Sequence, residues 1–197
     1  TPEGANVDTI LGPEMRSTGE VMGIDQMFGV AYAKAHEAVH AGYPLSGSVF
    51  VSVANRDKRH ALFPIKKLED LGFTIWATKG TASILELHGV KVNTVRKHSE
   101  EADAEGTPSV TEMIRNHQLD LVFNTPTGET QGGTPRADGY EIRTAAIFAE
   151  VPIITTVQGL EAAVQGIEAL QKGNVGVVSL QEWGNAIEDA LARRNRS

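Results

Sequence analysis

The sequence predicts an α/β fold, with a doubly wound (Rossmann-like) parallel sheet of five strands covered by helices. Two observations lead to this prediction. Between residues 48 and 173, short apolar runs alternate with longer stretches of helical periodicity, and glycine or proline lies near most of the junctions. Strands that alternate with helices at this spacing are typical of βαβ units, whose right-handed crossovers make neighbouring strands parallel.

The first part of the chain precedes this alternation. Residues 1–25 are rich in Gly, Thr, Pro and Glu without a sustained period, and are expected to be extended or loosely packed. A helix is expected over 26–41, because apolar residues recur there at helical spacing and Gly42 and Pro44 follow as stop signals. The segment 44–48 is the best candidate for a linker.

Five strands and their connecting helices are expected from residue 48 onward. The strands are short apolar runs, at 48–54, 73–77, 90–95, 119–123 and 151–155. The helices have amphipathic spacing, at 57–71, 81–88, 108–116, 138–150 and 158–171, with a last one in the tail from about Trp183 to Leu191. Pro64 is expected near a first turn, so the first of these helices is expected to begin later than residue 57.

Composition limits the classes of function. The 197 residues are 41% hydrophobic and 22% charged, enough for an ordinary core, and the net charge of −7 argues against binding to nucleic acid or anionic membranes. No apolar run approaches the ~20 residues of a membrane span, and no signal segment opens the chain. The absence of cysteine excludes disulfides and thiolate metal sites and fits a cytoplasmic protein. Since the chain begins with Thr1, it is expected to be a fragment of something larger.

One motif suggests a metal. The run His36-Glu37-Ala38-Val39-His40 matches the H-E-x-x-H pattern, in which two histidines on one helix face chelate zinc and the glutamate acts as a base. The alternative is coincidence on an exposed helix face, because three fixed positions in five recur by chance and no later helix offers an obvious third ligand. We therefore predict no metal site.

Small polar residues follow three of the predicted strands, at the point where each strand ends. They are Ser52 to Lys58, Thr78 to Thr81, and Asn124 to Gly128. In an open parallel sheet, ligands bind outside the carboxyl ends of the strands, so these loops are expected to converge. Hydroxyls, glycine N–H groups and lysine are what a phosphate oxyanion needs. The pattern predicts an anionic, phosphorylated small ligand.

Each of these loops also has a plainer explanation. Thr81 is also suited to be the N-cap of the helix 81–88, a position where an anion can bind as well, and Asn124 to Gly128 is also typical of a turn. Lys58 and Lys97 would by default be solvated surface lysines. Only their position near strand ends favours a role in binding phosphate. Ser52 has no base beside it in the sequence, so no nucleophile–base pair for acyl transfer is predicted.

Two parts of the sequence resemble a known family. The run from Leu11 to Gly23, LGPEMRSTGEVMG, is similar to the closing segment of the carbamoyl-phosphate-forming half of the carbamoyl-phosphate synthase large subunit family. The strand–loop set, together with Lys97 and the run Asp138-Gly139-Tyr140-Glu141-Ile142-Arg143, resembles the methylglyoxal-synthase-like domain at the C-terminus of that subunit. The resemblance implies two parts: 1–47 as the closing segment plus linker, and 48–197 as the regulatory domain.

The resemblance implies allosteric regulation. In that family the domain binds a phosphorylated nucleotide, UMP or IMP, and it is not itself catalytic. The effector-binding residues expected from the matching positions are Ser52, Lys58, Thr78, Gly80, Thr81, Lys97, Asn124, Thr125, Thr127, Gly128 and Arg143.

The remaining parts of such an enzyme are expected outside this chain. The resemblance implies no cofactor here, with ATP and Mg or Mn used by the full-length enzyme, a ligase that makes carbamoyl phosphate from glutamine and bicarbonate for pyrimidine and arginine biosynthesis. The implied partners are the remainder of the large subunit and the glutaminase small subunit.

Some positions depart from the family pattern. Members activated by ornithine resemble Tyr-Asp-Thr where this chain has Ile153-Ile154-Thr155, which puts ornithine activation in doubt, and the loop 128–137 is longer than the usual turn. The alternative function is a free-standing methylglyoxal synthase, a lyase acting on dihydroxyacetone phosphate. That family resembles Arg-Asp-Pro-Leu after the phosphate loop, whereas this chain has Glu129 to Gly132, which argues against it.

Overall fold

A computed structural model describes residues 21–39, 42–101, 106–126, 135–173 and 175–194. The chain divides into two units, and each is described by itself. The larger unit, Val21–Gly173, contains the sheet, and the other comprises Thr1–Glu20 and Asn174–Ser197. The helix described in the smaller unit is α7, Leu180–Arg194. Among the described residues, no helix combines the length and apolar character needed to cross a membrane.

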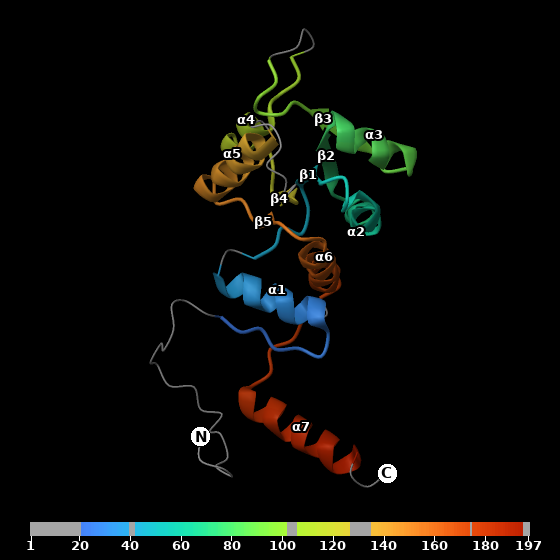
Figure 1. The fold of residues 1–197 in the computed structure, drawn as a ribbon. Helices are drawn as coiled ribbons and strands as arrows, with labels where there is room; N and C mark the ends of the chain where they lie inside the picture. The colour runs from blue at the N-terminus through green and yellow to red at the C-terminus, as the bar shows by residue number, and fades with distance from the viewer. Residues whose placement is uncertain (1–20, 40–41, 102–105, 127–134, 174, 195–197) are drawn as a thin grey trace. The chain divides into compact units, whose positions relative to one another are not determined.

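Strands and helices alternate through the larger unit (Figure 1). Their bounds, in chain order, are α1 Phe28–Val39, β1 Ser48–Ser52, α2 Lys58–Asp70, β2 Thr74–Thr78, α3 Lys79–Leu87, β3 Val92–Val95, α4 Val110–Arg115, β4 Leu121–Asn124, α5 Pro135–Phe148, β5 Ile153–Ile154 and α6 Val157–Gln171. The five strands form one sheet of order β3-β2-β1-β4-β5 in which every pair is parallel. The predicted fold class is confirmed.

The strand order reverses direction beside β1. From β1 the chain moves outward to β2 and β3, and then crosses back through α4 to place β4 on the other side of β1. In register, Ser52 pairs with Asn124 across β1 and β4, and Thr78 pairs with Val95 across β2 and β3. The carboxyl ends of four strands therefore lie along one edge, at the switch point where open α/β sheets bind their ligands.

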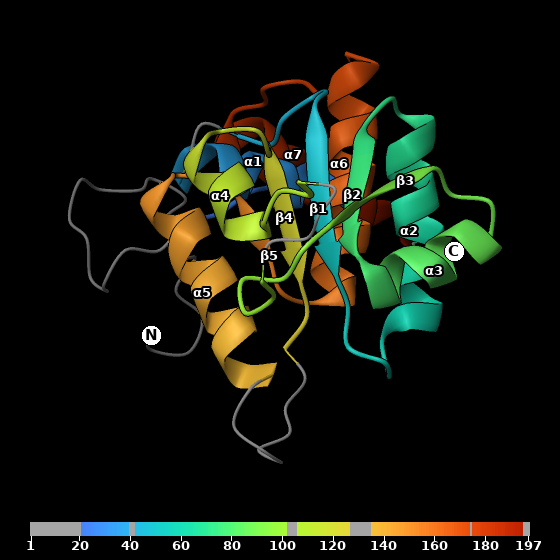
Figure 2. The ribbon, with the colours of Figure 1, turned by 90° about the horizontal axis from the view of Figure 1, so that it is seen from above.

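Helices cover both faces of the sheet (Figure 2), and an apolar core lies between the sheet and the helices on each face. Alternate residues of each strand point to opposite faces, so that Val49 and Val51 join the core shared with α2, α3 and α6, while Phe50 joins the core shared with α4 and α5. Because both faces are covered, β1 is buried throughout its centre, as its unbroken apolar sequence predicts.

Helix α2 begins within one residue of the predicted 57, without the later start that Pro64 suggested, and α3 begins earlier than predicted. Helix α2 starts at Lys58 and continues through Pro64, whose ring removes the bond that residue 64 would donate to the carbonyl of His60. Burial of the face formed by Ala61, Ile65 and Leu68 outweighs this loss. Helix α3 begins at Lys79 rather than at residue 81, which makes Thr78 its N-cap.

The segment before α1 also differs from the prediction. Residues 1–20 lie outside the described residues, but Gly23, Ile24 and Asp25 contact α1, the last two through Lys34. A Cβ atom on Gly23 would lie 1.9 Å from the carbonyl oxygen of Ala31. Helix α1 in turn packs against α6 within the same unit as the sheet. Whether residues 1–47 close the preceding half of a longer protein stays a prediction.

Candidate functional site

The β2–α3 junction supplies hydroxyls and free helix N–H groups. Thr78 is extended, with φ −68° and ψ 149°, and its side chain makes no capping hydrogen bond to α3. Thr81 is the third residue of the helix rather than its N-cap, and both threonines are largely buried, with 6% and 5% exposed. The first N–H groups of a helix carry partial positive charge and have no intrahelical acceptor. This junction therefore offers donors to an anion.

Lys58 connects this junction to the neighbouring loop. It is the first residue of α2, and its Nζ donates to the carbonyl oxygen of Gly80 at 3.1 Å. The loops after β1 and β2 thus come within hydrogen-bonding distance, as the sequence predicts for these two. One of the three protons on Nζ is used in this bond, so two remain for other acceptors.

The end of β4 is tied firmly to β1. Asn124 accepts a hydrogen bond from Arg143 Nη1 at 3.0 Å, and its Nδ2 donates to the carbonyl of Ser52 at 3.4 Å. Thr125 donates its N–H to the same carbonyl at 3.1 Å and accepts from the N–H of Ala54 at 2.8 Å. These contacts bring Ser52, Asn124, Thr125 and Arg143 together, and they hold the loop after β1 in place.

Two residues outside the predicted set of site residues stabilise the connection between β3 and α4. Arg96 donates through Nε to the carbonyl of Thr107 at 2.6 Å and through Nη1 to the carbonyl of Glu100 at 2.7 Å. Asp138 accepts from the N–H and the hydroxyl of Ser99 at 3.1 and 3.0 Å. The exposed Lys97 lies between these anchors. The sequence places Arg96 beside Lys97, but only the fold shows that Arg96 binds these two carbonyl groups.

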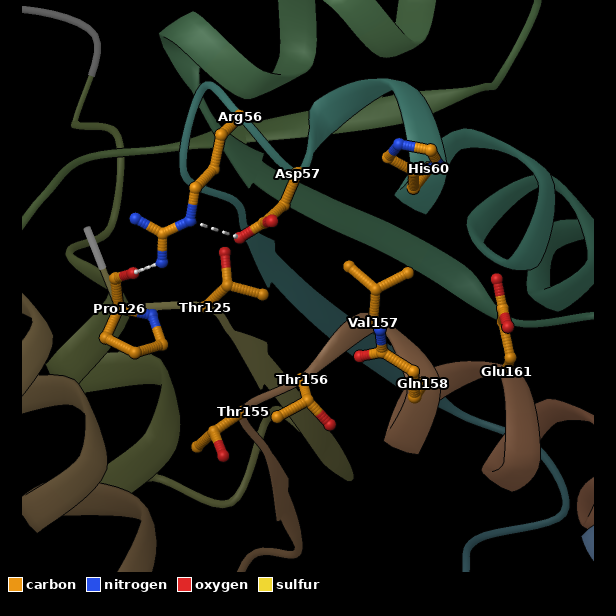
Figure 3. Close-up of a pocket in the computed structure, with 10 residues that line it drawn as sticks. All are labelled: Arg56, Asp57, His60, Thr125, Pro126, Thr155, Thr156, Val157, Gln158 and Glu161. Atoms are coloured by element: carbon orange, nitrogen blue, oxygen red, sulfur yellow. Dashed lines mark hydrogen bonds and ion pairs between the residues drawn. The ribbon is translucent and has the colours of Figure 1, made fainter. Parts of the chain in front are cut away.

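A cavity of about 360 Å³ opens on the other side of Thr125 (Figure 3). Arg56, Asp57 and His60 face the start of α6 across it, and Arg56 donates to the carbonyl of Pro126 at 2.7 Å. The full lining is Arg56, Asp57, His60, Thr125, Pro126, Thr155, Thr156, Val157, Gln158 and Glu161. Of the predicted effector-binding residues only Thr125 lines this cavity, although Arg56, Asp57 and Pro126 belong to the predicted loops. Thr155 and Thr156 also follow a strand end, so the same rule would have included them.

Some predicted residues are not placed at this edge. Thr127 and Gly128 lie outside the described residues, as does His40 of the H-E-x-x-H motif. His36 of that motif lies on α1 with its ring stacked on Tyr43 at 3.9 Å between centroids. Within the described part of the chain, no three His, Asp or Glu residues are grouped so that they could hold a metal ion.

Comparison with known proteins agrees with the resemblance seen in the sequence. The family described as MGS-like domain matches residues 60–155. The chain is 56% identical over 182 residues, 91% of its length, to the carbamoyl phosphate synthase large chain of Mycobacterium sp. (strain JLS). It is 54% identical over 186 residues to that of Mycobacterium tuberculosis (strain CDC 1551 / Oshkosh) and 54% identical over 179 residues to that of Streptomyces avermitilis, which are 94% and 91% of this chain.

The chain spans only a small part of these relatives. The matched region is 16% of the length of each one. The fold that the structure shows around β1 to β5 lies within this region, as does the edge that carries Lys58, Thr78 and Asn124. The chain therefore belongs with the carbamoyl phosphate synthase large chains, as a segment of that protein that contains an MGS-like domain.

Proposed function

We propose that this chain is the allosteric regulatory module of a carbamoyl phosphate synthase large chain and that its sheet edge binds a phosphorylated nucleotide such as UMP or IMP. The observation that carries the proposal is the open N-terminus of α3, with Thr78 and Thr81 beside it and Lys58 bridging to Gly80. A phosphate placed here would accept from helix N–H groups and from an ammonium group at once.

The width of the edge favours a nucleotide over a smaller phosphate ester. Adjacent strands lie about 4.8 Å apart, so the ends of β2 and β4, which lie on either side of β1, are roughly 10 Å apart from Thr78 to Asn124. A three-carbon phosphate is too short to reach from the phosphate loop at Thr78 to Asn124. A nucleotide with its phosphate at α3 has a ribose and a base that extend along this edge.

In this proposal the chemistry lies elsewhere in the longer protein. ATP, Mg or Mn, and the glutaminase small subunit serve parts that this chain does not contain, in the synthesis of carbamoyl phosphate for pyrimidine and arginine pathways in the cytoplasm. The nucleotide acts by binding two conformations of the whole enzyme with different affinity, since only such a difference shifts an equilibrium. The isolated chain should make no carbamoyl phosphate from ATP, bicarbonate and glutamine.

Calorimetric titration of the chain with UMP, IMP, dihydroxyacetone phosphate and inorganic phosphate tests the proposal. We expect a nucleotide to bind at least about tenfold more tightly than inorganic phosphate, a difference of about 1.4 kcal/mol. Binding of none of the nucleotides would overturn it. Release of inorganic phosphate and methylglyoxal from dihydroxyacetone phosphate would instead establish the alternative, a methylglyoxal synthase-type lyase.

A further inference from the structure

The connection between β3 and α4 leaves the sheet and returns to the edge from which it left (Figure 1). Val95, the last residue of β3, pairs with Thr78, and Arg96 directly after it pairs with Ser109 at the start of α4. The N–H of Arg96 also donates to the carbonyl of Pro108 at 3.0 Å. The outgoing and returning arms of this connection therefore meet at the carboxyl edge of the sheet, next to Thr78.

The side chain of Arg96 ties these two arms together. Its Nε donates to the carbonyl of Thr107 on the returning arm at 2.6 Å, and its Nη1 donates to the carbonyl of Glu100 on the outgoing arm at 2.7 Å. Its Nη2 lies 3.8 Å from the carboxylate of Glu112 on α4, and the side chain is only 15% exposed. An arginine presents its N–H groups as a rigid planar fork, so these bonds set the distance between the arms. Because all three nitrogens face protein acceptors, the guanidinium group is suited to hold this connection rather than to bind a ligand.

Lys97 lies in the turn 97–100, which Arg96 holds. The N–H of Glu100 donates to the carbonyl of Lys97 at 3.2 Å, and the N–H of Lys97 donates to the Glu100 carboxylate at 3.0 Å. The turn is also held by Asp138 in the first turn of α5, which accepts from the N–H and the hydroxyl of Ser99. The carboxylate of Glu100 is thus used on the backbone, and among the residues that the structure describes the ammonium group of Lys97 has no carboxylate partner. Its charge stays available to an anion at the sheet edge.

We infer that Arg96 is a positioning residue for nucleotide binding, which acts through Lys97 by fixing the turn 97–100 at the edge that carries Thr78. The inference rests on the proposed function, because it takes Lys97 to contact the bound nucleotide. A lysine is a point charge on a flexible stem, so its contribution to binding depends on where its backbone is held. Arg96 supplies this restraint before the ligand arrives, which reduces the cost of ordering the turn on binding.

A double-mutant cycle in the 197-residue chain tests the inference, with the affinities for UMP and for IMP measured by calorimetry. Arg96→Gln should lower the affinity at least about threefold, and Lys97→Ala should lower it by at least as much. The double variant should bind no more weakly than Lys97→Ala alone, because Arg96 then has no ammonium group to position. Both single variants should also lose the same part of the salt dependence of binding. The matched control for the lost charge is Arg115→Gln, on an exposed arginine of α4, which should bind like the parent.

Two outcomes would overturn the inference and leave the proposed function standing. Parent-like affinity in a folded Arg96→Gln protein would show that the bonds of Arg96 do not matter for binding. An equal loss from Arg96→Gln in the parent and in Lys97→Ala would show that Arg96 acts independently of Lys97. Arg96→Lys keeps the charge but not the planar fork, so it should lose affinity as well, and it repeats the cycle should Arg96→Gln fail to fold. Binding of neither nucleotide to the parent chain would instead refute the proposed function, and the inference with it.

Discussion

Helices α3 and α4 begin with almost the same backbone but use their first residues differently. Thr78 before α3 and Ser109 before α4 have φ of −68° and −80°, both with ψ 149°. Ser109 accepts from the N–H of Glu112 at 3.3 Å, and the Glu112 carboxylate accepts in return from the N–H of Ser109 at 3.0 Å. Thr78 makes no capping bond to α3, and the residue three positions later is Thr81, which has no carboxylate to form the reciprocal bond.

The difference explains why one helix start is structural and the other is suited to binding. At α4 the protein supplies its own carboxylate to the helix N-terminus, which leaves little for an external anion. The start of α6 is also closed, since Thr156 accepts from the N–H of Gly159 at 3.0 Å. At α3 the same donors are left for a ligand, and Lys58 lies beside them.

The most direct test of this contrast is to give the N-terminus of α3 a carboxylate like the one that Glu112 supplies at α4. Thr81→Glu introduces the missing carboxylate at the third helical position, where it should compete with a phosphate for the same N–H groups. We expect nucleotide affinity to fall at least about a hundredfold, some 2.7 kcal/mol, by calorimetry. Thr81→Gln is the matched control without the charge and should lose less. Unchanged affinity in a folded Thr81→Glu protein would contradict the site.

Substitution of the two lysines should have the next largest effect on nucleotide affinity, and the two effects should differ in size. Lys58→Ala removes an ammonium group already held against the phosphate loop, so affinity should fall roughly ten- to a hundredfold, or about 1.5–3 kcal/mol. Lys97 is exposed and farther along the edge, so Lys97→Ala should have the smaller effect and the stronger salt dependence. The free energy of unfolding should change by no more than about 0.5 kcal/mol in either variant. Parent-like binding by both variants would refute a phosphate site at this edge.

Much of this arrangement follows from the sequence, but the contacts that complete it do not. Apolar runs that alternate with helical periods predict five parallel strands, and strand ends predict where polar loops gather. The bond from Lys58 to Gly80 depends on α2 starting at Lys58, and Pro64 argues for a later start. The bonds from Ser99 to Asp138 join residues 39 positions apart, and no local pattern specifies such a pairing.

Beside Asn124, a substitution of Thr125 should act through stability rather than binding. Thr125→Val keeps the shape of a side chain that is 4% exposed but removes the acceptor of the Ala54 N–H. An unpaired buried donor costs about 1–3 kcal/mol, which urea unfolding would measure. Thr125→Ser keeps the hydroxyl and serves as the control. If Thr125→Val were as stable as the parent but bound nucleotide poorly, this hydroxyl would belong to the ligand site and not to the framework.

The smallest expected effect is a pH dependence confined to the closed helix. The N–H and the hydroxyl of Ser109 hold the pKa of Glu112 below its usual range. A carboxyl whose pKa is lower in the folded protein stabilises it above the unfolded pKa, near 4.3, and loses this contribution as the pH falls through the folded value.

Glu112→Gln isolates this contribution, because glutamine can still accept from Ser109 but does not titrate in this range. The parent should therefore be more stable than Glu112→Gln at pH 7 in urea unfolding. The difference should shrink as the pH is lowered past about 4, where the carboxyl becomes protonated. Nucleotide affinity at pH 7 should not change, since α4 is closed in both proteins. A stability difference that is constant from pH 7 to about pH 3 would show that the charge of Glu112 does not close α4, and the contrast with α3 would then rest on the hydroxyl of Ser109 alone.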